Sequence, residues 1–247
     1  MRATTPLRVD AEMSTLSFMG LSVDSASLVL AALTLCSVTF PTTGLAERLG
    51  GQPQVTSTYE SARPRAANFG LVKPSVDARR LADWVAFNDD NKSANFVVID
   101  KRSALLYLFN GNAQLSAVSA VLLGSALGDD TVPGIGDRPI ALVRPEERTT
   151  PAGRFVAERG RNARGEDVVW VDYDAAVSMH RVVTTNTAER RLERLASPTA
   201  SDNRISYGCI NLPVAFYESH IRPAFASQTG IVYILPEKAT IEQVFGL

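Results

Sequence analysis

The chain has 247 residues, with 25 lysines and arginines against 26 aspartates and glutamates. The formal charge of −1 gives no electrostatic reason to expect a nucleic-acid partner, and 45% hydrophobic residues are enough to build a core. Two cysteines and two histidines exclude a disulfide-rich scaffold and a four-cysteine zinc site. Any histidine-dependent chemistry must therefore use His180 or His220.

The first 46 residues have the pattern of an export signal. Residues 25–40 carry no charge, and this run is shorter than the roughly 20 apolar residues that span a bilayer. It is followed by Gly44-Leu45-Ala46, a small-x-small pattern typical of signal cleavage. We therefore expect export to the periplasm or cell wall. The alternative is an uncleaved anchor, and these residues would then make the only membrane contact.

The remainder divides into a linker and one domain. Residues 47–75 are rich in glycine, proline, serine and threonine without periodicity, which predicts a flexible linker. Residues 76–247 suit a single core. If residues 1–46 are removed, Cys36 is lost with them and Cys209 becomes the single cysteine of the mature chain.

The domain is predicted to be mainly β with a few peripheral helices. A helix is expected over residues 76–90, where apolar side chains recur at helical spacing. Short apolar runs predict strands at 96–100, 105–109, 115–123, 155–157, 168–171, 176–183 and 230–235, the first two forming a hairpin. Further helices are expected at 188–195 and 213–226.

The densest chemical pattern lies around Cys209, in the run Ser206-Tyr207-Gly208-Cys209-Ile210-Asn211. Gly208 permits a tight backbone turn beside the thiol, and successive N–H groups in such a turn can hold an oxyanion. A cysteine nucleophile also needs a base, because the thiolate is the reactive form. The candidates are His180, in a predicted strand, and His220, in a predicted helix.

These residues resemble a known family. Ser206-x-Gly208-Cys209-Ile210-Asn211, with His180 upstream, looks like the signature of the L,D-transpeptidase (YkuD-like) catalytic domain. Residues 96–109 are similar to the opening hairpin of that family, and the run Thr150-Pro151-Ala152-Gly153-Arg154-Phe155 resembles its Thr-Pro-x-Gly-x-Phe element. The resemblance covers roughly residues 95–236 and implies a β-sandwich or barrel-like catalytic domain.

The resemblance implies a peptidoglycan L,D-transpeptidase that needs no metal and no organic cofactor. Cys209 would attack a tetrapeptide stem, His180 would be its base, and the backbone carbonyl of Arg181 would orient the imidazole. An amine from a second stem or a protein would resolve the thioester. Water as the acceptor would instead make the protein an L,D-carboxypeptidase or crosslink hydrolase.

The same resemblance implies a set of supporting groups. Backbone N–H groups near Tyr207, Gly208 and Cys209 would hold the oxyanion, with Ser206 and Asn211 beside them.

Two departures from the family pattern put activity and specificity in question. Tyr207 stands where the family usually has a second histidine, and the interval from His180 to Cys209 is longer than usual. The surplus, residues 182–203, is predicted to be a lid with a short amphipathic helix. These departures leave open a catalytically inactive cell-wall-binding relative.

Three arginines near the motif are candidates for binding the carboxylates of a stem peptide: Arg190, Arg194 and Arg204. For Arg190 and Arg194, and for Arg191 beside them in the surplus segment, the alternative is an ordinary solvated helix face.

Overall fold

A computed structural model describes residues 65–226 and 229–247. The predicted export segment, residues 1–46, and residues 47–64 of the predicted linker lie outside the described residues. The last part of that linker, residues 65–75, packs on the domain. Ala67 and Phe69 are buried, and the Phe69 ring contacts Tyr107 and Phe109 edge-on. The folded domain thus begins before residue 76, because these apolar side chains complete its core.

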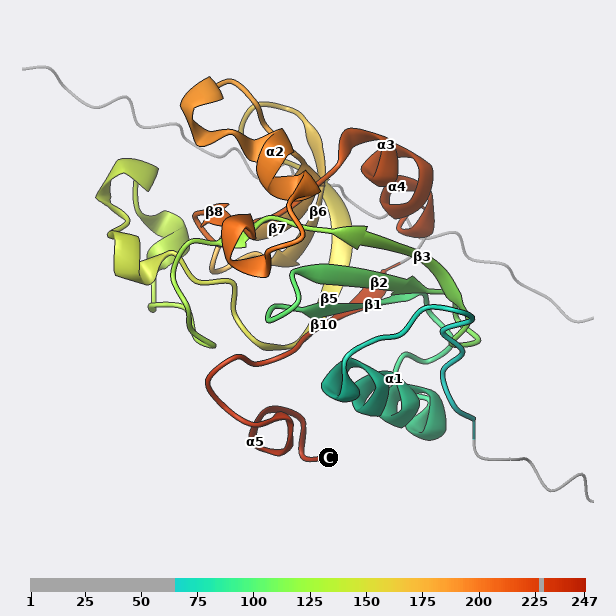
Figure 1. Cartoon of the computed structure of the whole chain (residues 1–247). Coiled ribbons are helices and arrows are strands. Elements are labelled where there is room, and N and C mark those ends of the chain that lie inside the picture. The colour runs from blue at the N-terminus through green and yellow to red at the C-terminus, as the bar shows by residue number, and fades with distance from the viewer. Residues whose placement is uncertain (1–64, 227–228) are drawn as a thin grey trace, which may run out of the picture. The chain divides into compact units, whose positions relative to one another are not determined.

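An eight-stranded sheet lies at the centre of the fold (Figure 1). Its strands, in spatial order, are β3 (Leu115–Ala120), β2 (Leu105–Phe109), β1 (Phe96–Asp100), β10 (Gly230–Ile234), β5 (Gly153–Arg161), β6 (Asp167–Asp172), β7 (Val177–Arg181) and β9 (Ile210–Leu212). The β1–β10 and β7–β9 pairs are parallel, and the other neighbours are antiparallel. Every predicted strand is present, and the mainly β fold class is confirmed.

The two edges of the sheet meet at Asn211, so that the sheet is nearly closed into a barrel. Leu122, just after β3, exchanges two backbone hydrogen bonds of 2.9 Å with Asn211 in β9. Next to it, β4 (Leu123–Gly124) pairs in parallel with β8 (Arg204–Ser206). The run 115–123, predicted as one strand, is therefore divided, because the chain changes partner from β2 to β9 and β8. The closure lies beside the Cys209 motif.

The inner strands are buried on both faces, and successive residues alternate between two cores. In β1, Val97 and Ile99 belong to one core, while Phe96 and Val98 belong to the other. The first core is covered by a helical segment made of α3 (Val214–Phe216), the π-turn η6 (Tyr217–Ile221) and α4 (Arg222–Ala224). The second packs against α1 (Val76–Asn88) and contains Ile241 of α5 (Ile241–Phe245).

The predicted helices are present with local differences. Ser75 caps α1, and the left-handed Asp89 ends it. The helix predicted at 213–226 contains the π-turn, next to Pro223, which has no N–H to donate. The helix predicted at 188–195 is two pieces, η4 (Thr187–Glu189) and α2 (Arg191–Ala196), which meet at Arg190 with φ of 50°.

The remaining helical turns are short. They are η1 (Ile135–Asp137), η2 (Ile140–Leu142), η3 (Pro145–Glu147) and η5 (Ala200–Asn203). Within residues 65–226 and 229–247, none of the helices has the length and apolar character needed to cross a membrane.

Candidate active site

Cys209 lies in the tight turn that joins β8 to β9. The buried Ser206 hydroxyl closes this turn, because it donates to the Cys209 carbonyl oxygen at 2.6 Å and accepts from the Gly208 N–H at 3.1 Å. Gly208 has φ of 130°, a conformation that side-chain-bearing residues rarely adopt. The Gly208 N–H already donates to the Ser206 hydroxyl. Of the three backbone N–H groups expected to hold the oxyanion, those of Tyr207 and Cys209 therefore remain.

Replacement of Gly208 by alanine is expected to distort this turn. A Cβ at this position would lie 2.8 Å from the Thr149 carbonyl oxygen, in addition to the strain of φ 130°. Strain of this kind costs about 1–3 kcal/mol, and the free energy of unfolding in urea measures it. The matched control is Gly134→Ala, where φ is 70° but no atom lies within 4 Å of the added Cβ. Equal losses in both variants would contradict the close contact at Gly208.

His180 is brought beside the turn by the pairing of β7 with β9. These strands run in parallel, with His180 opposite Asn211. The His180 Nδ1 lies 2.7 Å from the Arg181 carbonyl oxygen. A carbonyl only accepts, so Nδ1 carries a proton and Nε2 is the nitrogen left to exchange a proton with a thiol.

The Cys209 thiol is half-buried and has polar neighbours from β7 and from the residue just before it. Its Sγ lies 3.4 Å from the Ala176 carbonyl oxygen and 3.7 Å from the Ser178 hydroxyl. Ser178 and His180 are two residues apart in one strand, so their side chains face the same side. The thiol therefore sits against one face of β7, next to the imidazole.

Cys209 and His180 shift each other's pKa in opposite directions. Burial raises the pKa of the Cys209 thiol, but the hydrogen bond and charge of His180, together with hydrogen bonds from Ser178, outweigh burial, and the net shift is downward. Burial lowers the pKa of His180. Cys209 and the Arg181 carbonyl raise it by more than burial lowers it, so that the net shift is upward. Both shifts favour a thiolate–imidazolium pair, which is the reactive state of a nucleophilic cysteine.

The side chain of Arg181 holds its backbone in place. The guanidinium bonds to Asp167 of β6 at 3.0 Å and to Glu218 of η6 at 2.5 Å. It also lies 4.3 Å from the centre of the Tyr217 ring. These contacts with β6 and η6 fix the residue whose carbonyl orients His180.

The side chain of Asn211 joins the pair to the surplus segment. Its amide nitrogen donates to the Cys209 carbonyl oxygen at 3.2 Å and lies 3.4 Å from His180 Nε2. Its amide oxygen accepts from Arg191 of α2 at 2.6 Å. Because Asn211 is buried, its polar atoms need partners within the protein, and these contacts supply them.

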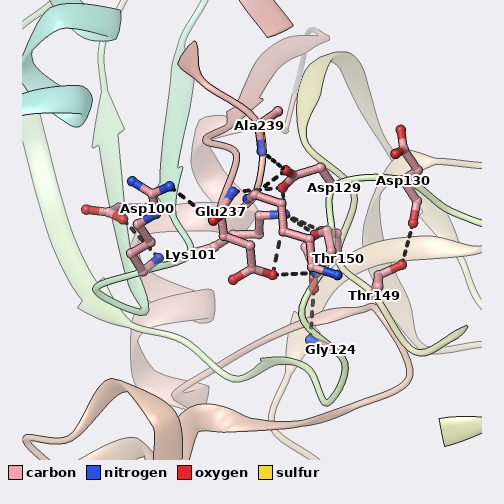
Figure 2. A network of polar contacts seen from close by, with 12 residues as sticks. Asp100, Lys101, Gly124, Asp129, Asp130, Thr149, Thr150, Glu237 and Ala239 are labelled. Carbon is pink, nitrogen blue, oxygen red and sulfur yellow. Dashed lines mark hydrogen bonds and ion pairs between the residues drawn. The ribbon is translucent and has the colours of Figure 1, made fainter. Parts of the chain in front are cut away.

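A polar network holds the segment that faces the Cys209 turn (Figure 2). The Thr150 hydroxyl donates to the Gly208 carbonyl at 2.8 Å and accepts from the Gly124 N–H at 2.9 Å. The Thr150 carbonyl accepts in turn from Lys101 at 2.9 Å. The Lys101 side chain is fully buried and forms an ion pair with Asp129. This network fixes Thr150 against the turn.

The network continues into the C-terminal segment. Burial raises the pKa of Asp129, but three backbone N–H groups at residues 237–239 and the Lys101 ammonium outweigh burial and lower it. Asp129 is thus a fixed anion that joins the loop after β4 to the end of the chain.

The structure brings together most of the sequence-predicted site residues: Cys209, His180, Arg181, Ser206, Gly208 and Asn211. Tyr207 adjoins them in the turn and stacks under the Arg148 guanidinium at 4.1 Å. His220, the alternative base, lies in η6 with its ring against Phe216.

The three arginines proposed for substrate binding have other partners. Arg204 pairs with Glu237 and donates to the Lys101 carbonyl oxygen. Arg190 pairs with Glu193 at the surface, and Arg194 donates to the carbonyl oxygens of Glu189 and Asp202. Their role in substrate binding stays a prediction.

Two contacting residues were missed from the sequence. Ser178 could have been found from its position two residues before His180, since alternate residues of a strand share a face. Arg191 was interpreted with Arg190 as part of a solvated helix face, and nothing in its local sequence separates the two. Only the fold shows that Arg190 is exposed and that Arg191 is largely covered.

A cleft of about 450 Å³ opens beside His180. Its walls come from the hairpin of β5 and β6, from the end of β7 and from α3, and include Arg161, Asp167, Val182 and Val214. Among the described residues, no three His, Cys, Asp or Glu side chains are grouped so as to hold a metal ion.

No protein-family model matches this sequence, and no curated protein matches it. Solved structures similar in fold include L,D-transpeptidase 1 of Mycobacterium tuberculosis, with 16% identity and a TM-score of 0.32, over 57% of this chain and 61% of the other. The cell-shape-determining protein Pgp2 of Campylobacter jejuni has 13% identity and a TM-score of 0.38, over 60% and 49%. An L,D-transpeptidase of Stackebrandtia nassauensis has 13% identity and a TM-score of 0.36, over 65% of each chain.

This chain thus spans about half to two thirds of the solved structures that it matches. Their identities and TM-scores are too low to carry over an activity. Function is therefore inferred from the residues of this chain.

Proposed function

We propose that this protein is a cysteine acyltransferase of the L,D-transpeptidase type that acts on peptidoglycan stem peptides. The contact between His180 Nδ1 and the Arg181 carbonyl, at 2.7 Å, carries the proposal. It leaves Nε2 to exchange a proton with Cys209, whose pKa is lowered by His180. The choice of substrate rests on the motif around Cys209 and on the Thr-Pro-x-Gly-x-Phe element that begins at Thr150.

In the first half-reaction, the Cys209 thiolate attacks the carbonyl carbon that precedes the terminal D-alanine of a tetrapeptide stem. The oxyanion accepts from the backbone N–H groups of Tyr207 and Cys209. The carbon–nitrogen bond then breaks, and the His180 imidazolium gives its proton to the departing amine. A thioester now joins the stem to Cys209, and His180 is neutral.

In the second half-reaction, an amine acceptor attacks the thioester carbonyl. Neutral His180 takes the proton of the amine, the carbon–sulfur bond breaks, and the thiolate–imidazolium pair forms again. A new amide is the product. We place the acceptor peptide in the cleft that His180 lines. The substrate requires a location outside the cytoplasm, in keeping with the export signal predicted for residues 1–46.

Digestion of isolated peptidoglycan with the purified protein tests this function. Mass analysis of the muropeptides is expected to show loss of D-alanine from tetrapeptides and new species in which two stems are joined. Tripeptides without joined stems would indicate hydrolysis, with water as the acceptor. An unchanged muropeptide profile would contradict the proposal and favour the inactive cell-wall-binding alternative.

A further inference from the structure

An arginine of the surplus segment 182–203 reaches the candidate active site. The Arg191 side chain is only 12% exposed, in contrast to 71% for its neighbour Arg190. Its Nη1 donates to the Asn211 amide oxygen at 2.6 Å, and its Nε bonds to Glu189 at 2.5 Å. These contacts place a largely buried cation one amide group away from His180.

The backbone of the segment is arranged to bury Arg191. Arg190, between η4 and α2, has φ of 50°, a left-handed conformation that residues other than glycine seldom adopt. The left-handed residue separates the two neighbouring arginines, one at the surface and one inside. Arg194 braces the same turn through the Glu189 carbonyl at 2.8 Å.

The segment is also anchored to the barrel. The buried Asn203 side chain donates to the Val121 carbonyl oxygen at 3.0 Å, next to the point where the sheet closes. Arg191 is thus presented by a fixed support. This goes beyond the lid predicted from the sequence, because the segment contributes a side chain to the site itself.

Resting on the proposed function, we propose that Arg191 is a positioning residue, which fixes the Asn211 amide with its nitrogen toward His180 and Cys209. The amide oxygen accepts from Arg191, so the two N–H groups must point the other way, toward the Cys209 carbonyl and His180 Nε2. A donor facing Nε2 favours the imidazole that is unprotonated at that nitrogen. Arg191 therefore helps His180 release its proton to the leaving amine.

The charge of Arg191 acts in the same direction. It lowers the pKa of His180, against the larger upward effect of Cys209. The remaining charged groups near His180 line the adjoining cleft and come from β5, the β5–β6 turn, β6 and β7: Arg161, Glu166, Asp167 and Arg181. Arg181 is paired with Asp167 and Glu218, and Glu189 is paired with Arg191 itself.

Titration of the two histidines by proton NMR tests this role without any substrate. With only His180 and His220 in the chain, the His220 signal is an internal reference. In Arg191→Met the pKa of His180 is expected to rise by about half a unit, an approximately threefold higher proton affinity. The surface control Arg190→Met is expected to leave it unchanged, as Arg190 bonds to Glu193 at the surface.

A second variant and a second measurement complete the test. Arg191→Lys keeps the charge but not the planar fork that reaches Glu189 and Asn211 together, so His180 is expected to titrate between wild type and Arg191→Met. If Arg191→Met does not fold, the titration of Arg191→Lys alone tests the proposal. The transfer rate is expected to fall about tenfold in Arg191→Met, and less in Arg191→Lys. A His180 pKa that matches the Arg190→Met control in both variants would overturn the positioning role.

The two proposals fail in different ways. If the wild-type protein performs no transfer, the proposed function is wrong, while the histidine titration still decides whether Arg191 acts on His180. If transfer occurs and the His180 pKa does not respond to Arg191, only the positioning role is wrong.

Discussion

Replacement of Cys209 by alanine is expected to abolish transfer, with a loss of at least about a thousandfold. Both half-reactions depend on a covalent bond to Sγ, which alanine cannot form. The loss is expected in the turnover of muropeptides, measured by mass analysis against the wild-type protein.

Folding should be retained in this variant. The half-buried Cys209 side chain contributes little to either core, and the Ser206 hydroxyl bonds to backbone groups that alanine keeps. The matched control is Ser178→Ala, which removes a neighbouring hydroxyl from the same face of β7 and leaves Sγ and His180 in place. Transfer by Cys209→Ala at the wild-type rate would show that the thiol is not the nucleophile.

Replacement of His180 by alanine is expected to lower transfer by roughly 10²–10⁴-fold, the usual contribution of a general acid–base group. The pH dependence of thiol alkylation should change as well. Burial raises the pKa of Cys209 and His180 lowers it, so without the imidazole burial dominates. The alkylation midpoint is expected to move upward, past the value of about 8.5 for an ordinary thiol.

The direction of this change follows from the coupled pair. In the wild-type protein the thiolate–imidazolium pair exists above the lowered pKa of Cys209 and below the raised pKa of His180. Alkylation should therefore begin at a lower pH than it does for an ordinary buried thiol. In His180→Ala, alkylation at a pH below the midpoint should be slower, by about tenfold for every pH unit that the midpoint moves upward. The control is His220→Ala, whose ring packs on Phe216. An unchanged alkylation profile in His180→Ala would show that His180 does not act on the Cys209 thiol.

The strands with the plainest sequence pattern are those buried on both faces. β1, β2 and β10 each have five residues, all of them apolar or aromatic except for Asp100 at the end of β1 and Gly230 at the start of β10. A short apolar run of this kind is enough to predict a buried strand. β8 and β9 were missed because each has three residues, which is too short for a pattern of alternation. Their pairing depends on distant partners, β4 for β8 and β7 for β9.

The candidate site divides in a similar way. Cys209, Gly208 and Ser206 could be proposed from their order along the chain, since one turn holds them and the reason for the glycine is local. The contact of Arg191 with Asn211 joins residues 20 apart in the sequence, through a segment that reads as a charged surface helix. A local pattern cannot show which of two adjacent arginines is buried. That depends on the left-handed backbone at Arg190.

The most direct test of the central claim is the intact mass of the protein after brief reaction with a tetrapeptide stem whose own amines are chemically blocked, so that no amine acceptor is present. A mass increase equal to the stem without its terminal alanine, located on Cys209 by peptide mapping and absent from Cys209→Ala, is the expected result. An unmodified protein, or an adduct on any other residue, would contradict the acyl-enzyme at Cys209.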